Sequence, residues 1–160
     1  MGEEVTADKL AFVAFEPRGG QIVALVSIEG LFSSDSDPET VLRKAAEVYE
    51  RSITRMKSLV EEIQASRADR KVVPARKIWK LGDAIFDLTG QLEELSLQID
   101  RLYDHLVRDL GAKRKWLEKV IIFRRYLPDK ELIPSSLNWG RCEKGTRRVA
   151  ERLRDGLPPG

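Results

Sequence analysis

The chain has 160 residues, of which 42% are hydrophobic and 34% charged, and its formal net charge is +2. This hydrophobic content excludes a disordered chain, and this length allows one domain, or one domain with an extended arm. The single cysteine, Cys142, excludes an internal disulfide, so we expect a reducing, cytoplasmic environment. Every apolar run is much shorter than the ~20 residues needed to cross a bilayer, and no signal peptide is evident, which predicts no membrane role.

The charges are distributed unevenly along the chain. Residues 1–110 contain 15 Lys/Arg and 20 Asp/Glu, a balance of −5, whereas residues 111–160 contain 13 and 6, a balance of +7. Clustered basic side chains gain free energy by neutralising phosphates and releasing counterions. The basic last third therefore indicates a polyanionic partner, with an ordinary solvated cationic surface as the alternative.

Two segments near the N-terminus have the composition of β-strands. Residues 9–15 and 21–31 are rich in β-branched and aromatic side chains, and Pro17, Arg18, Gly19 and Gly20 between them predict a turn. An isolated hairpin is only marginally stable in water. We therefore expect residues 1–33 to form a β-hairpin arm that packs on the helices or pairs with another strand, including one from a second copy of the chain.

Residues 38–110 carry the periodicity of two long helices. Ser36 or Asp37 caps the first helix and Pro38 lies in its first turn. Seven apolar residues of the first helix recur at heptad spacing. The pattern is interrupted before Pro74, and nine apolar residues of the second helix then recur at the same spacing. The first seam is Leu42, Ala46, Tyr49, Ile53, Met56, Val60 and Ile63, and the second is Ile78, Leu81, Ile85, Leu88, Leu92, Leu95, Ile99, Leu102 and Leu106. These seams predict an antiparallel, coiled-coil-like helical hairpin.

Two glycines interrupt the second predicted helix. Gly82 and Gly90 each destabilise a helix by roughly 1 kcal/mol relative to alanine. Their presence therefore predicts a kink or a close contact with a neighbouring helix at these positions.

Residues 102–127 have the pattern of a helix-turn-helix. With Gly111 as the turn glycine, apolar residues occupy the positions that such modules bury between their helices: Leu106, Leu110, Ala112, Leu117 and Val120. The second helix would then expose a face that meets bases or phosphates, formed by Lys113, Arg114, Lys115, Lys119, Ile122 and Arg125. The alternative is an ordinary corner between two helices.

The basic region extends to the C-terminus, so that the helix-turn-helix-like part covers residues 102–155. Residues 128–139 predict a loop and residues 140–154 a last amphipathic helix. The outer face of that helix offers further candidate phosphate contacts at Arg141, Lys144, Arg147 and Arg148. Glu143 and Glu151 lie at helical spacing and could instead balance these charges. Among the tryptophans, Trp116 beside the basic cluster is the best candidate for stacking on a base.

The sequence contains no recognisable catalytic arrangement. His105 and Cys142 are the only histidine and cysteine, so one chain cannot build the usual zinc site, and the pair lacks the motif of a nucleophilic enzyme. Arg101 and His105 resemble the Arg/His motif of HEPN-type ribonucleases, but only three residues separate them, fewer than that motif normally has. We therefore expect no enzymatic activity, no metal and no cofactor.

The order of four motifs resembles the helical N-terminal domain of YhcG-like nucleases. These motifs are IWKLGDAIFDL, LYDHLVRDLG, a basic helix ending in FRRYL, and LNW at the start of a last helix, and they cover residues 75–153. The resemblance implies a helical domain associated with nucleic acid, with Trp79, Gly82, Gly111 and Trp139 as framework residues. In that family a PD-(D/E)XK nuclease domain follows, and its absence from these 160 residues implies binding without cleavage.

The sequence therefore predicts a mainly α fold with an N-terminal hairpin, a long helical hairpin and a basic helix-turn-helix-like region. The favoured function is DNA binding by a homodimer, because seams of this kind oligomerise readily and paired modules can bind two half-sites. A helical scaffold for protein interactions or oligomerisation is the competing class, and a nuclease accessory subunit is the third.

Overall fold

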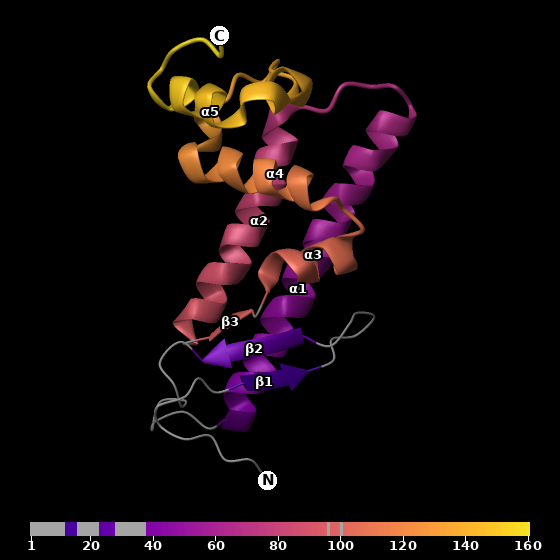
Figure 1. Ribbon diagram of the computed structural model, residues 1–160, viewed down its shortest axis with the longest axis vertical. Coiled ribbons are helices and arrows are strands. Elements are labelled where there is room, and N and C mark those ends of the chain that lie inside the picture. Colours follow the sequence, from indigo (N-terminus) through magenta and orange to yellow (C-terminus); the bar gives the residue numbers. More distant parts are fainter. Residues whose placement is uncertain (1–11, 16–22, 28–37, 96, 100) are drawn as a thin grey trace.

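The computed structural model describes the backbone of residues 12–15, 23–27, 38–95, 97–99 and 101–160 (Figure 1). This part of the chain is mainly helical, which confirms the predicted fold class at that level. Within it, no helix is both long enough and apolar enough to pass through a bilayer.

The two longest helices run side by side along the molecule (Figure 1). They are α1 (Pro38–Ala68) and α2 (Ala75–Glu94), and residues 69–74 connect them. Because this connection is short, the two helices are antiparallel. Pro74 precedes α2 in an extended conformation, which matches the predicted restart of the helical pattern at this residue.

The buried stripe of α1 follows the predicted heptad seam over most of its length. Five seam residues are buried, namely Tyr49, Ile53, Met56, Val60 and Ile63. Ala46 is only half-buried, whereas Ala45 and Val48 beside it are buried, so the stripe is wider than a two-helix seam. The side chain of Leu42 lies outside the described residues.

The prediction that the second helix continues to residue 110 is wrong, because α2 ends at Glu94. Residues Leu97–Ile99 form a short strand, β3, and a separate helix, α3, spans Leu102–Leu110. The apolar spacing did not reveal this break, because a strand and a helix can each bury one apolar face. Leu97 of β3, for example, is fully buried. The break is stabilised by a distant part of the chain, because β3 forms antiparallel backbone pairs with a strand near the N-terminus.

Two strands near the N-terminus complete a small sheet with the order β1-β2-β3. β1 (Phe12–Phe15) pairs antiparallel with β2 (Val23–Ser27), and the partners at the two ends of this pairing are Phe12 with Val26 and Phe15 with Val23. The turn predicted at residues 17–20 lies outside the described residues, so the hairpin arm stays a prediction.

The C-terminal third packs across the far end of the helix pair (Figure 1). Helix α4 (Arg114–Tyr126) crosses α2 and packs against α5 (Thr146–Arg154). Between them lie three single turns of 3-10 helix: η1 (Lys130–Leu132), η2 (Trp139–Arg141) and η3 (Glu143–Gly145). The last α-helix is therefore shorter than the predicted range of residues 140–154, because its N-terminal part forms 3-10 turns.

The contact between α2 and α4 is unusually close at Gly82. A Cβ atom at this position would lie 2.7 Å from Cβ of Arg124 and 2.9 Å from the backbone oxygen of Val120. The close helix contact predicted for Gly82 is therefore confirmed. Gly90 differs, because a Cβ there would meet no heavy atom within 4 Å among the described residues.

Candidate functional site

The nine predicted cationic site residues lie on α4, on the 3-10 turns and on α5. Eight of them are exposed, namely Lys113, Arg114, Lys115, Arg125, Arg141, Lys144, Arg147 and Arg148. Lys119 is half-buried. The predicted outward face of α4 is therefore interrupted near its middle, where Ile122 is also half-buried.

Arg114 contacts other parts of the protein despite its exposed position. Its guanidinium lies 2.9 Å from the carboxylate of Asp104 on α3 and 3.3 Å from that of Glu118 on α4. It also lies 4.9 Å from the ring centroid of Tyr103. Arg114 therefore braces α3 against α4, and its charge is largely balanced within the fold.

Two of the C-terminal arginines are also engaged. Arg147 pairs with Glu151 at 3.1 Å, as the helical spacing of the two residues indicates, and its guanidinium lies 4.7 Å from the ring centroid of Tyr126. Arg141 donates a hydrogen bond to the backbone oxygen of Gly160. The spacing of Arg147 and Glu151 therefore reflects charge balance within the helix, which was the alternative to a phosphate contact.

The remaining predicted cations have no acidic partner in the described part of the chain. No carboxylate lies within ion-pair distance of Lys113, Lys115, Lys119, Arg125, Lys144 or Arg148 there. Lys113 and Lys115 flank the start of α4, and Lys144 lies in η3. These unneutralised charges are the ones available to a polyanion.

The fold adds three basic residues that no sequence pattern indicated as site residues. Arg67 at the end of α1 lies 5.6 Å from the ring centroid of Trp116 on α4 and 3.8 Å from the carboxylate of Glu143 in η3. Arg70 and Lys71 follow in the exposed connection to α2. No local pattern could have found this set, because it depends on the contacts that Arg67 of α1 makes with α4 and η3.

We call the resulting surface the basic end. It lies where the α1-α2 connection, the first turn of α4 and η3 meet, at the end of the molecule opposite the sheet (Figure 1). Two backbone contacts hold this end together: the amide of Trp139 donates to the oxygen of Val73, and Pro74 forms a bridge with Asn138. Its members are Arg67, Arg70, Lys71, Lys113, Lys115 and Lys144.

The turn between α3 and α4 has the predicted local structure. Gly111 has φ of +66°, in the left-handed region that favours glycine, and four of the five predicted inward residues are buried. These are Leu106, Leu110, Leu117 and Val120, whereas Ala112 is half-buried. However, α4 lies between α2 and α5, so only its first turn and Arg125 are open to a large partner.

A buried polar cluster joins α1 to α3. The hydroxyl of Tyr49 donates to Oδ2 of Asp109 at 2.6 Å, and Nε2 of His105 lies 3.0 Å from the same oxygen but out of line for a good hydrogen bond. Nη2 of Arg108 lies 2.6 Å from Nδ1 of His105. Because a guanidinium can only donate, Nδ1 accepts and the proton of the neutral imidazole is on Nε2.

This cluster has the features of a structural anchor. The side chains of His105 and Asp109 are only 5% and 2% exposed, and Tyr49 is fully buried. Burial raises the pKa of the Tyr49 hydroxyl, and the hydrogen bond to Asp109 raises it further. The thiol of Cys142 contacts Asn138 rather than His105, and burial raises its pKa to about 11, which keeps it protonated.

Folding stability is expected to fall as the pH is lowered from about 7.5 to about 5.5, because of His105. Burial lowers the pKa of this imidazole below its ordinary value, and the nearby Arg108 lowers it further against the opposing effect of Asp109. The unfolded chain therefore binds a proton at a pH where the folded chain does not, which favours unfolding.

Urea denaturation at both pH values would measure this effect. His105 is the only histidine in the chain, so other side chains contribute little in this range. A His105→Gln variant should have a nearly flat profile. A slope that persists in this variant would show that another group is responsible.

The four framework residues of the predicted family resemblance all have structural roles. Gly82 and Gly111 allow the close helix contact and the turn already described. The indole of Trp79 donates to the backbone oxygen of Leu127 at 2.7 Å, and Trp139 is 1% exposed. Comparisons with family models, curated proteins and solved structures find no match for this chain. The relation to the N-terminal domain of YhcG-like nucleases therefore stays a proposal.

Proposed function

We propose that this chain binds nucleic acid, with DNA as the favoured partner, through the basic end and without catalysing a reaction. The observation that carries this proposal is the meeting of cations from three separate elements on one surface. Arg67 contacts both the first turn of α4 and η3, which bring Lys113, Lys115 and Lys144 with them.

The charge balance of this surface supports the proposal. Glu143 is the carboxylate nearest to Arg67, and their separation of 3.8 Å with both side chains partly exposed makes it a weak ion pair. Lys113, Lys115 and Lys144 have no acidic partner among the described residues. A phosphate backbone would supply the missing negative charge, and release of its counterions would favour binding.

The packing of α4 favours phosphate contacts over insertion of this helix into a groove. Leu117, Val120, Ile121 and Phe123 are buried, and α5 packs on the same helix. Lys113 and Lys115 are exposed at the start of α4, where they would contact phosphates. Such contacts fix the position of a duplex but carry little sequence information.

Fluorescence anisotropy with a labelled random duplex, titrated at low and moderate salt, tests this proposal. The informative variant replaces three exposed members of the basic end, Lys71, Lys115 and Lys144, with glutamine. It spares Arg114, which braces two helices. We expect about tenfold or greater loss of affinity at low salt, and the slope of log K against log salt should decrease by about 0.9 for each lost phosphate contact.

The matched control removes three exposed cations from the other half of α1, namely Arg43, Lys44 and Arg51. It makes the same change in net charge, so a general electrostatic effect would weaken both variants equally. Specific loss in the first variant supports the basic end as the binding surface. Absence of salt-sensitive binding by folded protein would refute the proposal.

A protein-interaction scaffold is the second candidate, and one cavity favours it. A cavity of about 400 Å³ lies among α2, α3 and α4. Its apolar lining includes Phe86, Tyr103 and Ile121, and Glu93 and Arg125 supply charges. A partner would insert an apolar side chain there, and a second copy of the chain is one such partner. Light scattering tests self-association.

A further inference from the structure

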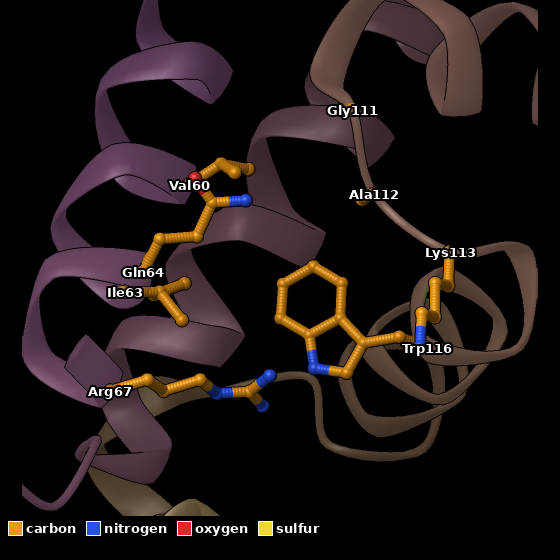
Figure 2. A pocket seen from close by; sticks show the side chains of 8 residues that line it. All are labelled: Val60, Ile63, Gln64, Arg67, Gly111, Ala112, Lys113 and Trp116. Carbon is orange, nitrogen blue, oxygen red and sulfur yellow. The ribbon is translucent and has the colours of Figure 1, made fainter. Parts of the chain in front are cut away.

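A separate cavity of about 260 Å³ lies beside the basic end, between the second half of α1 and the turn that leads into α4 (Figure 2). Val60 and Ile63 of α1 form an apolar part of its lining, and Gln64 and Arg67 continue along the same helix. Figure 2 shows the indole of Trp116 extending from α4 towards these residues. The cavity therefore combines an apolar surface, an aromatic ring and polar groups.

Three side chains at this cavity, two charged and one neutral, can only donate hydrogen bonds. Arg67 and Lys113 carry positive charges, and the indole N–H of Trp116 is buried with no acceptor among the described residues. A buried N–H without an acceptor is unfavourable. The side chain of Arg67 is 49% exposed and only weakly held by Glu143, so it can move when a ligand arrives. None of the residues that line the cavity is negatively charged, so the cavity suits a ligand that brings negative charge and hydrogen-bond acceptors.

The wall formed by Trp116 and Arg67 suits a flat ring. The guanidinium of Arg67 lies 5.6 Å from the centroid of the indole. Unpaired bases stack on both aromatic side chains and guanidinium planes. The volume lies just below the range of about 300–1,000 Å³ that is typical of small-molecule sites, so it suits one small ligand rather than a long segment.

We propose that this cavity binds one unpaired nucleotide, with its base against Trp116 and its phosphate near Arg67 and Lys113. The nucleotide is either free or part of a single strand, because both present the same ring and phosphate. This inference deepens the proposed function. It rests on that function only where the nucleotide belongs to a single strand of nucleic acid. Gln64 is placed to contact polar atoms of the base.

Nuclear magnetic resonance of the ¹⁵N-labelled full chain tests the inference through the indole N–H signals. The chain has three tryptophans, and a Trp116→Phe variant identifies the signal of Trp116. Thymidine monophosphate and a short oligothymidylate are the two probes, and polyglutamate serves as an acidic peptide. We expect the Trp116 signal to shift with oligothymidylate, while the signals of Trp79 and Trp139 stay in place.

Variants of the cavity separate this site from the basic end. Trp116→Phe should weaken binding of oligothymidylate at least fivefold and change duplex binding less than twofold. Arg67→Gln should weaken binding of both, because Arg67 lines the cavity and also belongs to the basic end. Arg51→Gln is the matched control on α1, because it removes an exposed arginine outside this cavity. A thermal melt of each variant shows that the fold is retained.

The outcomes distinguish this inference from the proposed function. A shift with both probes supports the site for either source, and a shift with thymidine monophosphate alone identifies a free nucleotide as the ligand. An unchanged Trp116 signal in a protein that still binds duplex through Lys71, Lys115 and Lys144 would overturn only the proposal for the cavity. An equal shift with polyglutamate would also overturn it, because the site would then recognise acidic chains in general. Loss of all nucleic-acid binding would overturn both proposals.

Discussion

Replacing Trp139 with alanine is expected to lower the free energy of unfolding by about 3–5 kcal/mol. This side chain is 1% exposed and packs edge-on against Phe123, with ring centroids 5.3 Å apart. Its backbone amide also donates to the oxygen of Val73, which joins η2 to the α1-α2 connection. Truncation would leave a cavity at the point where the C-terminal third meets the long helices. Guanidinium denaturation of the purified variant measures the loss.

Two controls separate the loss of packing from other effects. Trp139→Phe keeps an aromatic ring and removes an indole N–H that has no acceptor among the described residues, so it should cost less than about 1.5 kcal/mol. Leu157→Ala truncates a side chain that is 47% exposed and should stay within about 0.5 kcal/mol of the parent. Similar losses for Trp139→Ala and Leu157→Ala would contradict the assignment of Trp139 as a core anchor.

Gly82→Ala and Gly90→Ala are expected to change stability in opposite directions. Both glycines lie in α2, where alanine is intrinsically favoured by roughly 1 kcal/mol. At Gly82 the added Cβ would lie 2.9 Å from the backbone oxygen of Val120, so α4 would have to move away. We expect a net loss of about 1–3 kcal/mol at Gly82, because overpacking outweighs the helical preference. At Gly90 the space is open, so stability should rise by up to about 1 kcal/mol.

Urea denaturation of the two variants side by side measures this contrast, because each serves as the control for the other. The chemical change and the host helix are the same, so only the surroundings differ. A stabilising Gly82→Ala substitution would show that α2 and α4 do not approach each other as closely as the structure indicates.

The regular parts of the fold were predictable because their signals are local. The heptad spacing of Tyr49, Ile53 and Met56 predicted the buried face of α1, and each of these residues is buried. The turn at Gly111 followed from one glycine between two apolar helices. In these segments the neighbours that decide the conformation lie within one or two helical turns.

The break at Glu94 was not predictable from the same periodicity. Leu95, Ile99 and Leu102 continue the apolar spacing of α2, and a strand that buries one face satisfies it as well as a helix does. Pairing of β3 with β2 decided the outcome, and β2 lies far away in the sequence. The hydrogen bond of Tyr49 with Asp109 spans 60 residues of the sequence, so local periodicity could not predict it either.

The candidate site was predictable only in its composition. The excess of basic residues after Gly111 is a property of the sequence, and Trp116 was the best candidate there for stacking on a base. Which cations are neutralised is a tertiary property: Asp104 and Glu118 engage Arg114, whereas Lys115 has no acidic partner among the described residues.

The amino-acid sequence by itself determined the helical character of the chain, the stripe of α1 that is buried, the left-handed turn at Gly111 and the basic balance of the last third. The tertiary structure alone decided that β3 interrupts the second helix, that α5 packs on α4, and that Arg67 lies beside Trp116 and Glu143. The physical reason is the range of the interactions. Periodicity and backbone preferences act between close neighbours in the chain, whereas sheet pairing and the grouping of charges depend on which distant segments meet.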